Sequence, residues 1–470
     1  MFRKVTPRVT TALHQARHMH NLPQSSRRTV SSSTSNRSPL SMAGQPTSAP
    51  PPGLRSIPVP PGPGTKPIKQ RDLAKMPTSN VIRGLALLSV MSQPKLMDIA
   101  TKLVRSNLKL LTGNRISLAL LDQMFYWQFC AGATAAEIEA TCNRLKMLGY
   151  KGVIAMYARE VDTSMAHTMK SSEEVMAQHK KLVGEWMEGS LRTIECVKEG
   201  DFIALKLTGA GTEVVRALEA GEMPDEVMGD ALKEVCDAAA EKGVKITVDA
   251  EHAVQQKAID AWTMDLMRKY NRGKLVIYNT YQMYLKQTSD VLNSHLAMAE
   301  KEGFNLGVKL VRGAYINSDP RHLIHDTQED TNNAYDDTAA KLATYHLRNA
   351  GQGPEIGLVL ATHNKESIKK MRELRRQQFM KGEKMSEVVY AQLMGMADEL
   401  SLSLTMRDPN VSEEPIQVFK YFVWGTTEEC MLYLLRRAEE NKDAAQRTAD
   451  SQRALWNELK ARVLPAAATA

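Results

Sequence analysis

The chain has 470 residues, of which 43% are hydrophobic and 24% charged, and its formal net charge is +8. Residues 1–71 hold 11 of the 61 basic residues and no acidic residue, so the remainder has 50 basic against 53 acidic residues. The positive charge therefore belongs to a leader, and the slightly acidic body is not expected to bind nucleic acid.

Residues 1–30 are rich in Arg, Ser, Thr and His, and Phe2, Val5, Val9 and Leu13 fall on one helical face. This pattern predicts a mitochondrial targeting segment, and a disordered basic tail is the alternative. Residues 31–75 are Ser-rich and then Pro-rich, and 12 of the 20 prolines lie in the first 67 residues. We expect a disordered linker there.

No apolar run approaches the roughly 18–20 residues that a spanning helix requires, so we expect any membrane contact to be peripheral. The five cysteines include no Cys-x-x-Cys pair. Neither a disulfide framework nor a zinc site is indicated, and we expect reduced, mostly buried thiols.

Residues 76–148 predict a helical arm. Apolar residues recur at helical spacing in Val81–Met91, Leu96–Leu111 and Leu120–Gly132. Thr134-x-x-Glu137 is a capping box that opens a further helix, and Gly149 follows it as a stop signal.

From residue 149 to about 450 the chain alternates short strand patterns with helical patterns. This spacing predicts an α/β fold, and eight strands without a Gly-x-Gly-x-x-Gly after the first favour a (βα)₈ TIM-like barrel. Residues 451–470 are expected to be a helix end and tail. The expected strands are Gly152–Tyr157, Phe202–Thr208, Val244–Ala250, Lys274–Thr280, Gly307–Arg312, Gly357–Thr362, Val388–Leu393 and Val418–Val423. The helices expected between them include Glu173–Gly189, Pro224–Lys242, Ala253–Tyr270, Tyr284–Glu302, Ala334–Asn349 and Glu366–Phe379.

Polar residues follow most of the expected strands. In such a barrel the carboxyl ends of the strands carry the chemistry, so these side chains are expected to meet at one mouth. For each residue taken singly, a capping, ion-pair or solvated role fits equally well. The residues are Lys206, Asp249, Glu251, Asn279, Gln282, Lys309, Arg312, Tyr315, His363, Asn364 and Tyr421.

The last expected helix follows the capping box Thr426-x-x-Glu429. One of its sides is apolar, and the other is a stripe that admits two interpretations: a solvated face, or a guanidinium fork for a small carboxylate. Spacing alone leaves both open. The apolar side holds Met431, Leu434, Leu435 and Ala438, and the stripe holds Tyr433, Arg436, Arg437 and Glu440.

The segment from Tyr433 to Asn441, Tyr-Leu-Leu-Arg-Arg-Ala-Glu-Glu-Asn, resembles the C-terminal signature of the proline dehydrogenase family. Val308–Tyr315, Ala361–Asn364 and Asn279–Gln282 resemble its fifth-, sixth- and fourth-strand motifs, the last in the eukaryotic form. The similarity extends over about residues 120–445 and points to the eukaryotic mitochondrial type.

The resemblance implies a flavoprotein that binds FAD at the strand ends and oxidises L-proline to Δ1-pyrroline-5-carboxylate. Electrons would pass to ubiquinone or another membrane acceptor on the matrix side of the inner mitochondrial membrane. By the same resemblance, Arg436, Arg437 and Lys206 hold the substrate carboxylate. Tyr421 and Leu393 or Met394 border the ring, and Asp249 and Tyr315 support the basic cluster. Glu440 is counted with the catalytic residues. Cofactor contacts are implied for Asn279, Gln282, Lys309, Arg312, Ala314, Thr362, His363 and Asn364.

The sequence departs from the family pattern at three places, of which the first is the end of the first strand, Met156–Glu160, where the similarity is only loose. Many bacterial members have Arg and then Lys where this chain has Lys309 and then Arg312, and Val423 stands where a Pro is common.

Two other classes of function stay open. A Schiff-base aldolase would use Lys206 as its nucleophile, and a barrel without catalysis would serve as a scaffold. The sequence does not indicate an oligomeric state.

Overall fold

Eight parallel strands close into a barrel in which each strand pairs with the next and β8 pairs with β1. This confirms the predicted (βα)₈ architecture. The computed structural model describes residues 71–464 apart from 92, 160–170, 350–351, 407–413 and 443–444, so the expected targeting segment and most of the linker lie outside the described residues. The strands are β1 Gly152–Tyr157, β2 Phe202–Leu205, β3 Lys245–Val248, β4 Ile277–Gln282, β5 Leu306–Val311, β6 Ile356–Ala361, β7 Glu387–Leu393 and β8 Gln417–Trp424.

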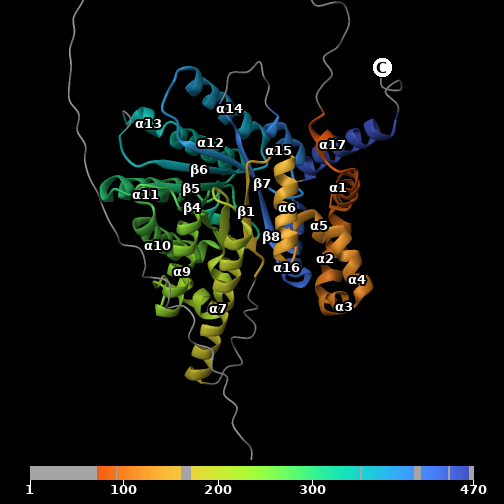
Figure 1. Cartoon of the computed structure of the whole chain (residues 1–470), viewed down its shortest axis with the longest axis horizontal. Coiled ribbons are helices and arrows are strands. Elements are labelled where there is room, and N and C mark those ends of the chain that lie inside the picture. Colours follow the sequence, from red (N-terminus) through yellow and green to blue (C-terminus); the bar gives the residue numbers. More distant parts are fainter. Residues whose placement is uncertain are drawn as a thin grey trace, which may run out of the picture. The chain divides into compact units, whose positions relative to one another are not determined.

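Helices surround the barrel in a ring that Figure 1 shows from one side. The helix over Ala253–Tyr270 has the predicted bounds. The helix predicted for Ala334–Asn349 instead begins at Gln328, because Thr327 and Asp330 form an unrecognised capping box, and it divides into two. The helices are α7 Ser172–Cys196, α8 Thr212–Ala220, α9 Glu226–Lys242, α10 Ala253–Tyr270, α11 Thr288–Glu302, α12 Gln328–Ala343, α13 Tyr345–Arg348, α14 Lys365–Met380, α15 Asp398–Thr405 and α16 Thr427–Lys442.

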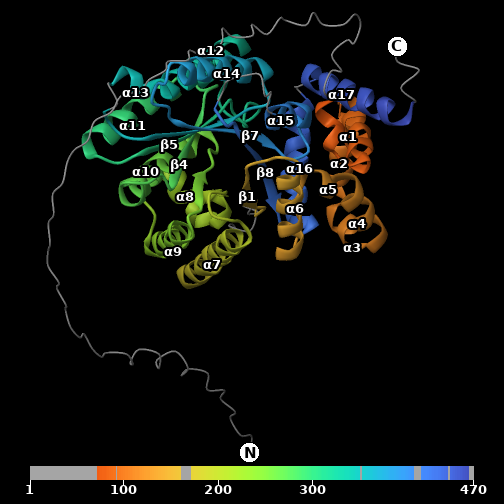
Figure 2. The same cartoon turned by 45° about the horizontal axis from the view of Figure 1, so that its top comes forward.

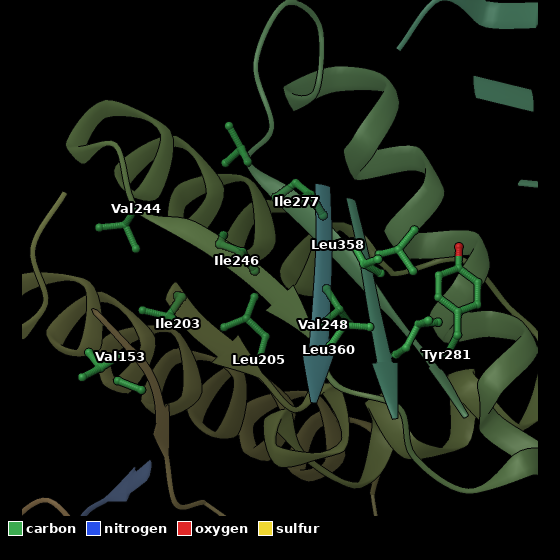
Figure 3. Packing of buried hydrophobic residues seen from close by; sticks show 14 of the residues in the cluster. Val153, Ile203, Leu205, Val244, Ile246, Val248, Ile277, Tyr281, Leu358 and Leu360 are labelled. Atoms are coloured by element: carbon green, nitrogen blue, oxygen red, sulfur yellow. The ribbon is translucent and has the colours of Figure 1, made fainter. Parts of the chain in front are cut away.

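Alternate residues of each strand face the helices and the barrel interior. The outward set is mostly aliphatic and forms the main core between strands and helices, as Figure 3 shows for Ile203, Ile246 and Leu358. The inward set includes the aromatic rings of Phe202, Tyr278 and Phe419.

The inward aromatic rings close the amino-terminal end of the barrel. Phe202 packs edge-on against Tyr278 and Phe419, with ring centroids 5.1 and 5.6 Å apart. Lys245 Nζ lies 2.7 Å from Glu387 Oε2 and 5.3 Å from the Phe202 ring centroid. Since this end is filled, space for a ligand remains at the carboxyl ends of the strands.

The arm before the barrel contacts the start of α16. Tyr126 donates a hydrogen bond to the Gly425 carbonyl at 2.6 Å, and Thr427 donates to Asp122 at 2.5 Å. The capping boxes at Thr134 and Thr426 are both present, as predicted. The arm comprises α1 Thr78–Met91, α2 Pro94–Ser106, α3 Leu108–Gly113, α4 Arg115–Leu121, the π-helical turn η2 Asp122–Tyr126, α5 Trp127–Phe129 and α6 Ala135–Met147.

Three arm predictions need correction. The expected linker does not extend to residue 75, because the turn η1 Asp72–Lys75 is folded and Leu73 is buried. The pattern Leu96–Leu111 is divided between α2 and α3 at Asn107. The prediction of a continuous helix over Leu120–Gly132 is wrong. The helix ends before Cys130, whose backbone forms an isolated parallel β-bridge with Val423 of β8.

The C-terminal segment is a full helix, α17 Ala445–Val463, beside α1 (Figure 2). Leu455 is buried, and Arg462 donates to the Leu73 carbonyl at 2.9 Å. A helix end and tail were expected over residues 451–470, but the helix continues to Val463. The many Arg, Lys and Glu residues of this segment obscured the buried positions that pack it against the arm.

All five cysteines are free thiols, and four of them are buried, as expected. Within the described part of the chain, no helix combines the length and the apolarity needed to span a bilayer.

Asn279 lies on the outward face of β4 and not in the barrel interior. It is fully buried and donates to Asp260 Oδ1 of α10 at 2.8 Å, and Gln256 donates to the same oxygen at 2.8 Å. Burial raises the pKa of Asp260 from 3.8 to about 6, and these two hydrogen bonds oppose the rise.

This carboxylate makes stability depend on pH. Because its folded pKa exceeds its unfolded pKa, its favourable contribution is complete below pH 3.8 and is lost as pH rises through about 6. Asp260→Asn keeps the Oδ1 acceptor and removes the charge. Its free energy of unfolding, relative to the wild type, should therefore rise by about 3 kcal/mol between acidic and neutral pH.

Urea unfolding at several pH values measures this difference. Asp265→Asn, at a partly exposed position of the same helix, is the matched control. An Asp260→Asn difference that does not vary with pH would contradict the assignment.

Candidate active site

A cavity of about 550 Å³ occupies the carboxyl ends of the strands. It is the opening that remains above the aromatic rings of the barrel floor. Eleven of the residues expected at the site line it: Lys206, Asp249, Gln282, Lys309, Arg312, Ala314, Tyr315, Thr362, His363, Leu393 and Tyr421.

Three of these residues form one network inside the barrel, each from a different strand or strand end. Lys309 is 4% exposed, and its Nζ lies 2.5 Å from Asp249 Oδ1. The Tyr421 hydroxyl donates to Asp249 Oδ2 at 2.7 Å and lies 2.9 Å from Met156 Sδ. Lys309 Nζ also lies 5.1 Å from the Tyr421 ring centroid. Asp249 thus links β5 and β8 across the lumen and fixes the tilt of the Tyr421 ring.

A second cation, Lys206, follows β2 beside the buried Glu251. Its Nζ is 3.9 Å from Glu251 Oε2, and Thr208 donates to that carboxylate through both its backbone N–H and its hydroxyl. Burial raises the pKa of Glu251, while Lys206 and Thr208 oppose the rise. The Lys206 carbonyl also accepts from Trp186 Nε1 at 3.0 Å, which holds the strand end in place.

Arg312 lies at the rim and is extensively hydrogen-bonded to the protein. Its guanidinium donates to Asn332, Thr362 and Ser367 at 2.6–2.8 Å. It also lies over the ring of Tyr335, 4.4 Å from the centroid. These contacts fix one orientation of the guanidinium plane.

Backbone donors orient two further side chains of the cavity. The Leu393 N–H donates to His363 Nε2 at 3.2 Å, so the neutral imidazole carries its proton on Nδ1. Gln282 accepts from the Ala314 N–H at 3.2 Å and donates to the Glu251 carbonyl at 2.9 Å. Tyr315 stacks at a tilt against His252, with ring centroids 4.2 Å apart.

The structure does not bring every expected residue to the cavity. Asn279 faces α10, so direct cofactor contact from this position is wrong. Asn364 is the N-cap of α14 and accepts from the backbone of Glu366 and Ser367, so its side chain acts as a helix cap. The side chains of Arg436, Arg437 and Glu440 lie outside the described part of α16, whose Tyr433 is buried and lines the cavity.

Sequence reasoning missed Lys420, a lysine of β8 that is 1% exposed. Its Nζ lies 2.8 Å from Asp398 Oδ1 and donates to the carbonyls of Leu393 and Met396 at 3.3 and 3.0 Å. Leu393 and Met396 both line the cavity. Lys420 therefore fixes the turn between β7 and α15, and a charged residue inside an otherwise apolar strand was the available signal.

A comparison with protein-family models matches the family described as proline dehydrogenase over residues 138–450. A probable mitochondrial proline dehydrogenase of Schizosaccharomyces pombe is 28% identical, covering 72% of this chain and 79% of that protein. Proline dehydrogenase 1, mitochondrial, of Arabidopsis thaliana is 27% identical over 84% and 85%. Hydroxyproline dehydrogenase of Mus musculus is 28% identical over 82% and 92%.

Among solved structures, proline utilization A (PutA) from Bdellovibrio bacteriovorus superposes with a TM-score of 0.55. The identity is 15%, and the match covers 79% of this chain and 38% of that one, so the likeness concerns the barrel fold. Since the family model matches well over half of the sequence, including every strand of the barrel, the chain belongs to the proline dehydrogenase family.

Proposed function

We propose that the protein is a mitochondrial oxidoreductase that uses FAD to oxidise L-proline to Δ1-pyrroline-5-carboxylate. The observation that carries the proposal is the meeting of Lys206, Asp249, Lys309 and Tyr421 in one cavity at the carboxyl ends of the strands. Family membership supplies the reaction class, and the basic cavity suits a small anionic substrate.

The donor set supports a bound flavin. Thr280 Oγ1 is buried, lines the cavity and has no hydrogen-bond partner among the described residues. A buried hydroxyl is satisfied by a partner, which here is either a polar ligand atom or an ordered water. Lys309, Arg312, Gln282 and the Ala314 backbone would hold the flavin, with His363 and Thr362 on the β6 side. When bound, FAD supplies the acceptor for two electrons and a hydride.

In this proposal, Lys206 holds the proline carboxylate together with Arg436 and Arg437. Nearby cations bind the anion and favour loss of a proton from the ring amine. Asp249 orients Lys309 and the Tyr421 ring, because each of its two carboxylate oxygens accepts a hydrogen bond from one of them. No separate general base is assigned.

We further propose ubiquinone or a similar membrane quinone as the electron acceptor, with a peripheral contact on the matrix side of the inner membrane. The basic segment 1–30 and the mitochondrial names of several relatives support this location.

The first test is Lys206→Met in the full chain, assayed with L-proline and a soluble dye acceptor. Loss of a partly buried carboxylate partner should weaken substrate binding by on the order of 2–5 kcal/mol, seen as a raised KM, while FAD content is retained. The matched control is Lys245→Met, which removes another barrel lysine at the closed end and should leave KM unchanged.

Equal KM values for the wild type and Lys206→Met would contradict the proposed carboxylate site. Covalent trapping of substrate on Lys206 by borohydride would favour a Schiff-base enzyme instead.

Substrate preference provides the second test, because Tyr421 is expected to cover the pyrrolidine ring. An added hydroxyl would lie against a ring whose own hydroxyl is already bonded to Asp249. A polar group buried without a partner costs roughly 1–3 kcal/mol, so kcat/KM for L-proline should exceed that for 4-hydroxyproline by about one to two decades.

Tyr421→Ser should move this ratio toward hydroxyproline, while Tyr421→Phe keeps the ring and should not. The measurement is kcat/KM for both substrates in the wild type and the two variants. A ratio that shifts equally with Phe and with Ser would show that the hydroxyl, rather than the ring, sets the preference. A ratio that does not move with Ser would contradict the placement of Tyr421 over the substrate ring.

A further inference from the structure

Among the described residues of α2, α3 and α4, five large aliphatic side chains are exposed. Helices α2, α3 and α4 lie together at one edge of the folded part, and α2 and α3 contact α16 (Figures 1 and 2). Single exposed apolar residues are common, but a group of this size on three adjoining helices indicates an interaction surface. The exposed fractions are Ile99 64%, Leu103 61%, Leu110 72%, Ile116 83% and Leu120 59%.

These five side chains are distinct from the buried residues through which the arm packs against the rest of the protein. On α2, Thr101 is buried and Val104 packs against the core cluster that contains Tyr421. Ile99 and Leu103 lie about 40° apart around the helix at 100° per residue, and Ile116 and Leu120 of α4 are spaced in the same way. Each pair therefore forms a short apolar stripe.

Basic residues accompany the stripes. Residues 91–121 contain five basic residues and one acidic residue, whereas the chain after residue 71 has 50 basic and 53 acidic residues. Lys102, three positions from Ile99, is exposed, and so is Arg115 next to Ile116. The local charge is therefore opposite in sign to that of the body.

We propose that this arm surface, comprising Ile99, Leu103, Leu110, Ile116, Leu120 and the exposed basic residues Lys102 and Arg115, docks on a bilayer surface rich in anionic lipid. Aliphatic side chains with Lys and Arg beside them are the composition of helices that lie in the membrane interface. A second copy of the chain fits less well, because it would bring two surfaces of the same charge together. The proposal rests on the proposed transfer of electrons to a membrane acceptor, and it identifies the face that approaches the membrane.

The test is flotation of the purified full chain, without substrate, with phosphatidylcholine vesicles that contain either no phosphatidylglycerol or about one molecule in five. The wild type should float with the anionic vesicles, and salt should weaken binding because it screens the basic residues. Dye-linked proline oxidation and the FAD spectrum, measured separately, report folding and the proposed reaction.

Two double variants separate the contributions. Leu103→Ser/Ile116→Ser should lower the vesicle partition coefficient by on the order of tenfold at any salt concentration. Lys102→Gln/Arg115→Gln should lower it by about thirtyfold at low salt and little at high salt. The matched controls on α14 and its C-cap, Phe379→Ser/Met380→Ser and Lys369→Gln/Lys381→Gln, also alter exposed side chains and should bind like the wild type.

Unchanged flotation of the Leu103→Ser/Ile116→Ser variant would overturn the proposal, as would equal losses in the α14 controls. A shift from dimer to monomer in the arm variants, without any lipid binding by the wild type, would assign the surface to a second copy. Because activity is read with a soluble dye, loss of vesicle binding with activity intact is distinguishable from failure of the proposed reaction.

Discussion

A buried lysine at the open end of the barrel imposes the strongest constraint on the site. Lys309 is almost fully enclosed, so its charge requires a partner, and Asp249 provides one. The second carboxylate oxygen of Asp249 then accepts from Tyr421. Removal of one partner from such a pair typically costs 3–5 kcal/mol, so the three side chains hold β5, the end of β3 and β8 in one arrangement.

The floor of the barrel explains why this network is next to a cavity. Tyr278 fits within the lumen because Gly307 and Gly357 stand beside it, where a Cβ at residue 357 would lie 2.4 Å from the Tyr278 hydroxyl. The large ring and the two small residues fill the amino-terminal half. The carboxyl half has the short side chains of Ala361 and Ala391, which leave room for a ligand.

Much of this arrangement could be predicted from the sequence. Strand and helix patterns repeat at βα spacing. Lys206 and Asp249 follow apolar runs, while Lys309 and Tyr421 interrupt them, so the barrel and its polar end could be predicted. Side-chain direction was harder. The fourth strand was expected at Lys274–Thr280 but lies at Ile277–Gln282. Successive residues of a strand point to opposite faces, so the pattern did not determine whether the Asn279 side chain points inward or outward. Asn364 was ambiguous for another reason, because the same residue type caps helices and binds ligands.

Long-range partners were also beyond the sequence. Lys420 is explained by Asp398 and by two carbonyls of the β7–α15 turn, and no local pattern relates these positions. The exposed stripes of α2 and α4 looked like ordinary core positions, since helical spacing shows that a face is apolar without showing what covers it. The described part of the chain thus has an apolar, basic face on the arm and a polar cavity in the barrel, which are the two surfaces that the proposed membrane-linked reaction would use.

The most direct measurement is the visible spectrum of the full chain, reconstituted with FAD and titrated anaerobically with L-proline. The account predicts a yellow protein whose flavin absorbance is bleached by L-proline, and an Asp249→Ala variant that retains its flavin but needs much more proline for the same bleaching. A protein that binds no FAD, or a bound flavin that L-proline does not reduce, would contradict it.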